Sequence, residues 1–194
     1  MSSLPSHLGG HKSRTHIDVG VLKFARDKLK VKSMLDLGCG PGGQVYEAQK
    51  LGLNVMGVDG DFTLLREQPE LFVTHDFTKG KLEVDSHLAL IKNYDMIWCC
   101  EFVERIKEKY VDNWMSLTQK GKYVFMTYSD LGKSGHHHVN CQPLKYWIDL
   151  YNKYGFELNV ELTNESKEHS VPIKLSNLDD EINSLWRPFI VDLL

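Results

Sequence analysis

Residues 33–43 join a short apolar run to a glycine-dense turn, in the order Ser-Met-Leu-Asp-Leu-Gly-Cys-Gly-Pro-Gly-Gly. Apolar residues at helical spacing follow over 44–51. This order predicts a strand, a tight turn and a helix N-terminus, where backbone N–H groups can approach a nucleotide-type ligand. Asp36 stands two residues before the first glycine of the turn. A loop that binds only a pyrophosphate gains nothing from a carboxylate there, so we expect a ligand with a cationic amino group.

The composition is that of an ordinary globular protein: 42% of the 194 residues are hydrophobic and 25% are charged, and the formal net charge is -3. These values predict one domain over 1–194, with an N-terminal arm over 1–16, a core over 17–165 and a C-terminal segment over 166–194. The slight acidic excess weighs against a large, uniform nucleic-acid-binding surface. No apolar run reaches the roughly 18 residues of a membrane span, and the four cysteines lack paired C-x-x-C spacing. We expect a cytoplasmic protein with free thiols and no membrane partner.

Apolar runs typical of strands alternate with amphipathic runs typical of helices. We expect helices over 17–29, 44–51, 62–67, 103–115, 143–154 and 178–185, and strands over 33–37, 54–59, 71–74, 94–100, 122–128, 156–162 and 189–194. The alternation predicts an α/β fold, a Rossmann-like doubly wound and mostly parallel sheet with helices on both faces. Right-handed crossovers bring the carboxyl ends of the strands to one edge, so the ligand should lie there beside the first strand.

Three aspartates stand near the ends of the first three predicted strands. Asp59 is positioned to accept hydrogen bonds from two vicinal ribose hydroxyls. Asp76 is positioned to accept from an adenine amino group, with Phe77 beside the ring. Together with Asp36, these carboxylates would repel one another in a shared crevice unless a ligand supplies donors and positive charge.

The run over 35–42 resembles the first motif of class I S-adenosylmethionine-dependent methyltransferases. Asp59 matches the ribose-binding acidic position of that family, and Asp76 with Phe77 matches its adenine-binding position. The stretch 101–106 is similar to one in which many small members carry Glu-His-Val or Glu-His-Ile, but Arg105 replaces the histidine, so no role of an imidazole is carried over. The resemblance covers roughly residues 30–165 and also includes the Gly-Phe turn at 155–156.

This resemblance implies a sheet of about seven strands with the last one antiparallel, S-adenosylmethionine as cofactor and S-adenosylhomocysteine as product. It implies that Asp36 orients the methionine end of the cofactor. The expected cofactor-binding residues are Asp36, Gly38, Cys39, Gly40, Asp59, Gly60, Asp76, Phe77, Cys99 and Arg14. A turn without a ligand and an NAD-type site are the alternatives. Asp36 and the Pro within the turn favour S-adenosylmethionine over NAD, because that ligand needs no pyrophosphate cradle.

The loop after the predicted fifth strand carries three consecutive histidines and should overhang the acceptor side of the crevice. A histidine near its ordinary pKa of about 6.5 can serve as a general base. We expect catalytic roles for His137, His138 and Glu101, and acceptor contacts from His136, Asn140 and Tyr128. The alternative is that the histidines cap the next helix or face solvent.

A metal site is a second interpretation of the same histidines, with Asp130 or Glu101 adding a carboxylate. No second pair of ligands at a recognisable spacing supports it, so we expect no metal.

The arm over 9–18 combines flexible glycines with cationic and imidazole side chains. It is expected either to close over the cofactor, with Arg14 meeting the methionine carboxylate, or to remain solvated while Thr15 or Asp18 caps the first helix.

Motifs of several nucleic-acid methyltransferases are missing from the sequence. Residues 98–101 do not form the Asp/Asn-Pro-Pro-aromatic motif of amino-methylating DNA enzymes, and neither a Pro-Cys nucleophile nor a Lys-Asp-Lys-Glu set is evident. We therefore expect methyl transfer to an O- or N-nucleophile of a small-molecule or glycan-type acceptor, with no indication of an oligomeric state. The alternatives are a catalytically silent S-adenosylmethionine-binding partner protein, a nucleic-acid or protein methyltransferase, and an NAD-dependent oxidoreductase.

Overall fold

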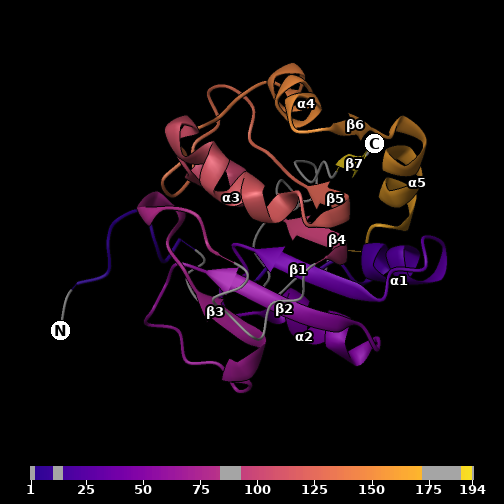
Figure 1. Cartoon of the computed structure of the whole chain (residues 1–194), viewed down its shortest axis with the longest axis horizontal. Helices are drawn as coiled ribbons and strands as arrows, with labels where there is room; N and C mark the ends of the chain where they lie inside the picture. Colours follow the sequence, from indigo (N-terminus) through magenta and orange to yellow (C-terminus); the bar gives the residue numbers. More distant parts are fainter. Residues whose placement is uncertain (1–2, 11–14, 84–92, 172–188, 194) are drawn as a thin grey trace.

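The computed structural model describes residues 3–10, 15–83, 93–171 and 189–193. Its strands form one sheet in the order β3-β2-β1-β4-β5-β7-β6, with helices on both faces (Figure 1). The strands are β1 (Ser33–Leu37), β2 (Asn54–Asp59), β3 (Phe72–Thr74), β4 (Tyr94–Cys99), β5 (Gly121–Met126), β6 (Phe156–Leu158) and β7 (Phe189–Leu193). β1 to β5 are parallel, whereas β7 runs antiparallel to both of its neighbours, β5 and β6. The expected Rossmann-like, mostly parallel sheet with an antiparallel last strand is confirmed.

Two apolar layers enclose the sheet because successive strand residues point to opposite faces. The α-helices are α1 (Val19–Asp27), α2 (Gly43–Lys50), α3 (Val111–Thr118), α4 (Leu144–Lys153) and α5 (Val160–His169). On one face, Met34 of β1 packs in a buried cluster with Leu22 of α1 and with residues of α2. On the other face, Leu35 joins a cluster with Trp114 of α3 and with residues of α4. β1 is thus buried on both faces, which explains its almost uninterrupted apolar sequence.

The strand order reverses at β1. Asp36 pairs with Gly57 of β2 on one side and with Trp98 of β4 on the other. From β1 the chain continues to β2 and β3 in one direction and returns to β4 in the other, which is the arrangement that opens a crevice at the carboxyl ends of the strands. The loops after β1, β2 and β4 therefore meet at this edge.

Two sequence predictions are wrong. Residues 62–67 form no helix, and Oδ1 of Asp61 accepts hydrogen bonds from the backbone N and Oγ1 of Thr63 in a local turn, at 2.8 and 2.6 Å. The predicted strand over 156–162 stops at Leu158, because Asn159 caps α5 by accepting from the backbone N of Leu162.

The single helix expected over 103–115 is also wrong. Two 3-10 turns, Val103–Arg105 and Glu108–Tyr110, precede α3, and Ile106 and Lys107 between them are extended. The strand expected over 189–194 is confirmed as β7 over its described residues. The helix expected over 178–185 lies outside the described residues.

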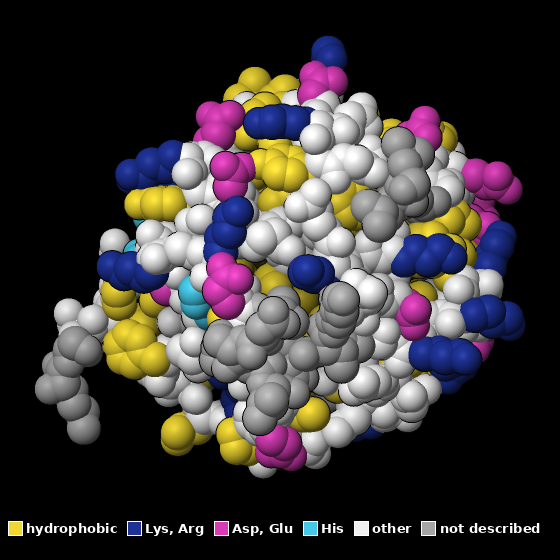
Figure 2. Space-filling model, in the orientation of Figure 1, with side chains coloured by type: hydrophobic (Ala, Val, Ile, Leu, Met, Phe, Trp, Pro, Cys, Tyr) yellow, Lys and Arg dark blue, Asp and Glu magenta, His cyan; other side chains and the backbone are white. Residues whose placement is uncertain are grey.

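Charged side chains do not separate by sign on the face shown in Figure 2. Lys and Arg are interspersed with Asp and Glu over the described part of that face. Among the described residues, no helix is long and apolar enough to cross a bilayer.

Candidate active site

The turn after β1 is held so tightly that only glycine fits at its first position. Gly38 has a φ of 77°, and a Cβ there would lie 2.5 Å from Cδ2 of Phe102. Its backbone N donates to the carbonyl oxygen of Val58 at 2.8 Å, while the N of Gly40 donates to Oδ2 of Asp59 at 2.8 Å. The turn is therefore fixed against the end of β2, and its main chain lies beside the Asp59 carboxylate.

Asp36 contributes a buried carboxylate to this edge of the sheet. The residue is only 3% exposed. Burial, and then the negative charge of Asp59, raise the pKa of Asp36 well above its ordinary value. A ligand with a cationic group would relieve both effects, as the sequence position of Asp36 suggested.

Asp59 is pre-oriented by backbone donors. Oδ2 accepts from Gly40, and Oδ1 accepts from the backbone N of Asp61 at 2.8 Å. Each carboxylate oxygen has two acceptor positions, so one on each oxygen is free of these backbone contacts. This is the geometry required to bind a pair of hydroxyls.

The carboxylate of Asp76 already has hydrogen-bond partners within the protein. Oδ1 accepts from the backbone N and Oγ1 of Thr78, at 2.9 and 2.7 Å, and Oδ2 lies 3.0 Å from Nε2 of His7. Burial alone would raise the pKa of Asp76, but the hydrogen bonds from Thr78 and His7 outweigh it and lower the pKa. His7 was not among the expected site residues, because nothing in the irregular sequence of the arm marks one histidine over another.

A cavity of about 350 Å³ lies between these carboxylates and the N-terminal arm. The expected cofactor residues that line it are Asp36, Gly38, Cys39, Gly40, Asp59, Gly60, Asp76 and Phe77. Cys99 does not line it, because its side chain is fully buried in β4, whereas the next residue, Cys100, does. Arg14 lies outside the described residues.

The N-terminal arm forms one wall of the cavity. The arm residues that line it are His7, Leu8, Gly9, Gly10, Thr15 and His16. Asp18 caps α1 by accepting from the backbone N of Val21 at 2.9 Å. The described part of the arm therefore lines the cavity, and Asp18 caps the first helix. Closure of the arm over a cofactor stays a prediction.

Two of the residues expected on the acceptor side, Glu101 and His136, line the cavity. Glu101 follows β4 with a φ of 52°, and its backbone N donates to Oγ1 of Thr127 at 2.9 Å. A non-glycine residue in this left-handed conformation is uncommon and is often found at functional sites. Nε2 of His136 lies 3.3 Å from the carbonyl oxygen of Leu8, which joins this loop to the arm.

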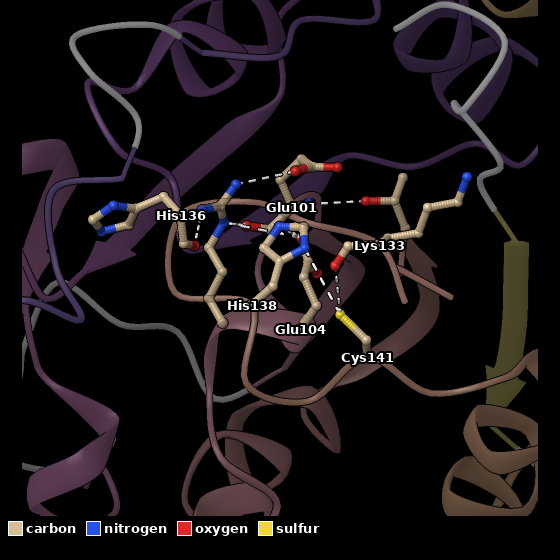
Figure 3. Close-up of polar contacts among 8 residues, drawn as sticks. Glu101, Glu104, Lys133, His136, His138 and Cys141 are labelled. Atoms are coloured by element: carbon tan, nitrogen blue, oxygen red, sulfur yellow. Dashed lines mark hydrogen bonds and ion pairs between the residues drawn. The ribbon is translucent and has the colours of Figure 1, made fainter. Parts of the chain in front are cut away.

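His138 does not line the cavity but lies beside Glu104 (Figure 3), and one of its ring nitrogens is within 4.8 Å of a carboxylate oxygen of Glu101. Burial, and then the charge of Glu101, raise the pKa of Glu104 to about 8. Burial, and then the charge of Arg105, lower the pKa of His138. Glu104 was missed by the sequence analysis, which placed it within the helix expected over 103–115.

The remaining expected site residues lie elsewhere. His137 does not line the cavity, and its ring centroid lies 5.9 Å from that of His7. Asn140 is buried, and its Oδ1 accepts from Nε2 of Gln142 at 3.3 Å. Tyr128 packs against the apolar core beside Trp147. Of the six expected residues, Glu101 and His136 line the cavity, and His138 lies beside Glu101 without lining it. His137, Asn140 and Tyr128 do not line the cavity.

Comparison with known proteins agrees with this geometry. Residues 35–126 match the family model described as a methyltransferase domain. No curated protein sequence matches the chain. The methyltransferase domain of bacterial CtHen1 superposes with a TM-score of 0.61 at 16% identity, covering 90% of this chain and 96% of that one.

Two further solved structures share the fold. Magnesium protoporphyrin IX methyltransferase from Synechocystis with bound S-adenosylmethionine gives a TM-score of 0.55 at 15% identity, covering 89% of this chain and 74% of that one. A putative RNA methyltransferase from Pyrococcus horikoshii superposes with a TM-score of 0.51 at 13% identity. The superposition covers 90% of this chain and 81% of that one. The chain has the class I, Rossmann-like methyltransferase fold. The match of residues 35–126 to the methyltransferase domain model agrees with the resemblance identified in the sequence.

Proposed function

We propose that this chain is an S-adenosylmethionine-dependent methyltransferase that acts on an O- or N-nucleophile of a small-molecule or glycan-type acceptor. The observation that carries the proposal is the convergence of Asp36 and Asp59 on one cavity beside a glycine turn. A buried carboxylate suits the amino group of the methionine moiety, and a carboxylate held by backbone donors suits the ribose hydroxyls. Asp76 and Phe77 line the cavity where the adenine would be recognised.

The bound cofactor supplies an electrophilic methyl group on a sulfonium, and the protein must hold the acceptor in line with it. Glu101 and His136 follow β4 and β5 and line the cavity, so they are the residues proposed to contact the acceptor. His7 and Leu8 of the arm line the same space.

Titration calorimetry tests the cofactor assignment directly. S-adenosylmethionine and S-adenosylhomocysteine should bind and NAD should not, whereas binding of NAD alone would contradict the proposal in favour of an oxidoreductase. Release of S-adenosylhomocysteine with metabolite extracts then tests catalysis. Binding without release in any extract would favour a catalytically silent partner protein.

The acceptor class is tested with the same assay on separated fractions. Small-molecule and oligosaccharide fractions should support release of S-adenosylhomocysteine. Activity confined to RNA, DNA or protein fractions would overturn the proposed acceptor while leaving the methyltransferase assignment intact.

A further inference from the structure

Three side chains with metal-binding atoms meet beside the cavity. One carboxylate oxygen each from Glu101 and Glu104 and one imidazole nitrogen of His138 all lie within 4.8 Å of one another. Glu101 lies two residues after the end of β4, Glu104 lies in the 3-10 turn Val103–Arg105, and His138 belongs to the loop after β5. Figure 3 shows the His138 ring beside Glu104, whereas the ring of His136 points away from both glutamates.

Backbone hydrogen bonds fix these two loops against each other. The backbone N atoms of Val139 and Asn140 both donate to the carbonyl oxygen of Glu104, at 2.9 and 3.0 Å. The backbone N of Glu101 donates to Oγ1 of Thr127 at the end of β5. The three side chains are therefore brought together by the fold and do not meet by chance rotation of exposed groups.

The buried carboxyl group of Glu104 is the strongest indication that a ligand binds between these three side chains. Its side chain is fully buried, and among the described residues neither carboxylate oxygen has a hydrogen-bond partner. The nearest cationic or imidazole groups are Nε of Arg105 at 3.9 Å and Nε2 of His138 at 4.0 Å. A buried carboxylate without donors is costly, because nothing replaces the water that it loses on burial.

Arg105 does not resolve this deficit, although it lies next in the chain. Its guanidinium donates to Oε2 and to the carbonyl oxygen of Glu101, at 3.1 and 2.7 Å, and to the carbonyl oxygen of His136 at 2.6 Å. The 3.9 Å separation from Glu104 is too long for a hydrogen bond. Arg105 thus donates its hydrogen bonds to Glu101 and to the backbone of His136. It donates none to the carboxylate oxygens of Glu104.

The orientation of His138 places an acceptor atom opposite this carboxylate. Its Nδ1 lies 3.8 Å from Sγ of Cys141, and that thiol donates to the carbonyl oxygen of Lys133. When the thiol hydrogen is donated to Lys133, the sulfur accepts from Nδ1–H, and the lone pair of His138 is then on Nε2, which faces Glu104. This imidazole nitrogen and one oxygen from each glutamate converge within 4.8 Å of one another, which is the arrangement of a cation site. A ring whose second nitrogen is held by another group is also the usual arrangement of a histidine ligand.

We propose that Glu101, Glu104 and His138 bind a divalent cation beside the cofactor cavity. Two carboxylate oxygens and one imidazole nitrogen suit Mn²⁺, Mg²⁺ or Zn²⁺. Binding of the ion would release the proton held by Glu104, and the two carboxylates would then match the charge of the ion. With ligand bonds of about 2.0–2.2 Å, two ligands of one ion lie about 3–4 Å apart, so the 4.0 Å between Glu104 and His138 requires little adjustment.

The proposed site leaves coordination positions open, and Glu101 connects it to the cavity. A cation there would bind an oxygen nucleophile of the acceptor and lower the pKa of its hydroxyl, as metal ions do for bound water. This part of the inference rests on the proposed function and favours an O-nucleophile over an N-nucleophile. The binding of the ion itself does not depend on it.

The test is a titration of the chelator-treated full-length chain with MnCl₂, followed by electron paramagnetic resonance, and with MgCl₂ and ZnCl₂ by calorimetry. At least one of the ions should bind at one site per chain, and Glu104→Gln and His138→Ala should each weaken that binding by at least about tenfold. Asp130→Asn is the matched control, because it removes an exposed carboxylate of the same loop and should leave the affinity unchanged.

Binding of none of the three ions, or binding equally strong in Glu104→Gln, His138→Ala and the control, would overturn the proposal. Far-ultraviolet circular dichroism shows whether each variant folds, and Glu101→Gln, at a half-buried position, replaces Glu104→Gln if that variant does not. Because these titrations contain neither cofactor nor acceptor, their result is separate from that of the methyltransferase assays.

Discussion

Nε2 of His7 lies 3.0 Å from Oδ2 of Asp76, although 69 positions separate the two residues in the chain. A side chain of the N-terminal arm therefore contacts the carboxylate that the sequence predicts to bind the adenine. Removing this side chain frees Asp76 for the ligand. His7→Ala should raise the affinity for S-adenosylhomocysteine about two- to fivefold, since a partly exposed ion pair contributes about 0.5–1 kcal/mol.

Calorimetry of the His7→Ala variant measures this change, with His169→Ala on α5 as the control that removes a histidine far from the cavity. A fall in affinity would show instead that His7 contacts the ligand.

Asp59→Ala should weaken binding of S-adenosylmethionine by more than about tenfold, because the variant loses the acceptor expected for the ribose hydroxyls. It also releases the backbone N atoms of Gly40 and Asp61 that the carboxylate holds. The exposed Asp149→Ala on α4 is the control. An affinity that does not change would remove Asp59 from the cofactor site.

Burial, followed by repulsion from Asp59, raises the pKa of Asp36 in the folded state. The folded protein then binds a proton that the unfolded chain has already released, so the contribution of Asp36 to stability is lost as pH rises above the ordinary aspartate pKa. As pH rises above the ordinary aspartate pKa, the free energy of unfolding should fall more steeply in the wild type than in Asp36→Asn.

At neutral pH, Asp36→Asn should be the more stable protein by roughly 1–3 kcal/mol, although it binds the cofactor less tightly. Urea unfolding at several pH values measures the difference. If the free energy of unfolding changed with pH in the same way in both proteins, the raised pKa of Asp36 would be contradicted.

Gly38→Ala should destabilise the fold more than Gly52→Ala. Both glycines have a positive φ, but an added Cβ meets Phe102 at 2.5 Å at position 38 and nothing within 4 Å at position 52. The backbone strain common to both should cost about 1 kcal/mol, and the clash should bring the cost at position 38 to about 3 kcal/mol. Equal losses in thermal unfolding would mean that Phe102 moves away freely.

Continuous apolar runs made the central strands predictable. β1 and β2 have the bounds expected from the sequence, because both of their faces are buried and the glycines or polar residues that follow end them sharply. The three acidic positions were found for the same reason, since each lies within two residues of the end of a parallel strand. Local polar contacts were harder to foresee, as the turn at Asp61 and the cap formed by Asn159 show.

The acceptor side of the site was predictable only in part. His136 and Glu101 were expected there, but the burial of Glu104 depends on the break in the helix at Ile106 and Lys107, which turns the segment 103–105 toward the loop after β5. The Glu-x-x-Glu spacing of residues 101 and 104, taken with the histidines, was the available signal. The contact of His7 with Asp76 depends on the path of an arm that carries no periodic pattern.

The most direct test of methyl transfer follows the labelled methyl group itself. The chain is incubated with methyl-labelled S-adenosylmethionine and with separated small-molecule, oligosaccharide, RNA, DNA and protein fractions of a cell extract. We predict that label enters a small-molecule or oligosaccharide fraction and that Asp59→Ala abolishes most of this transfer. No transfer to any fraction by a protein that binds the cofactor would contradict the account.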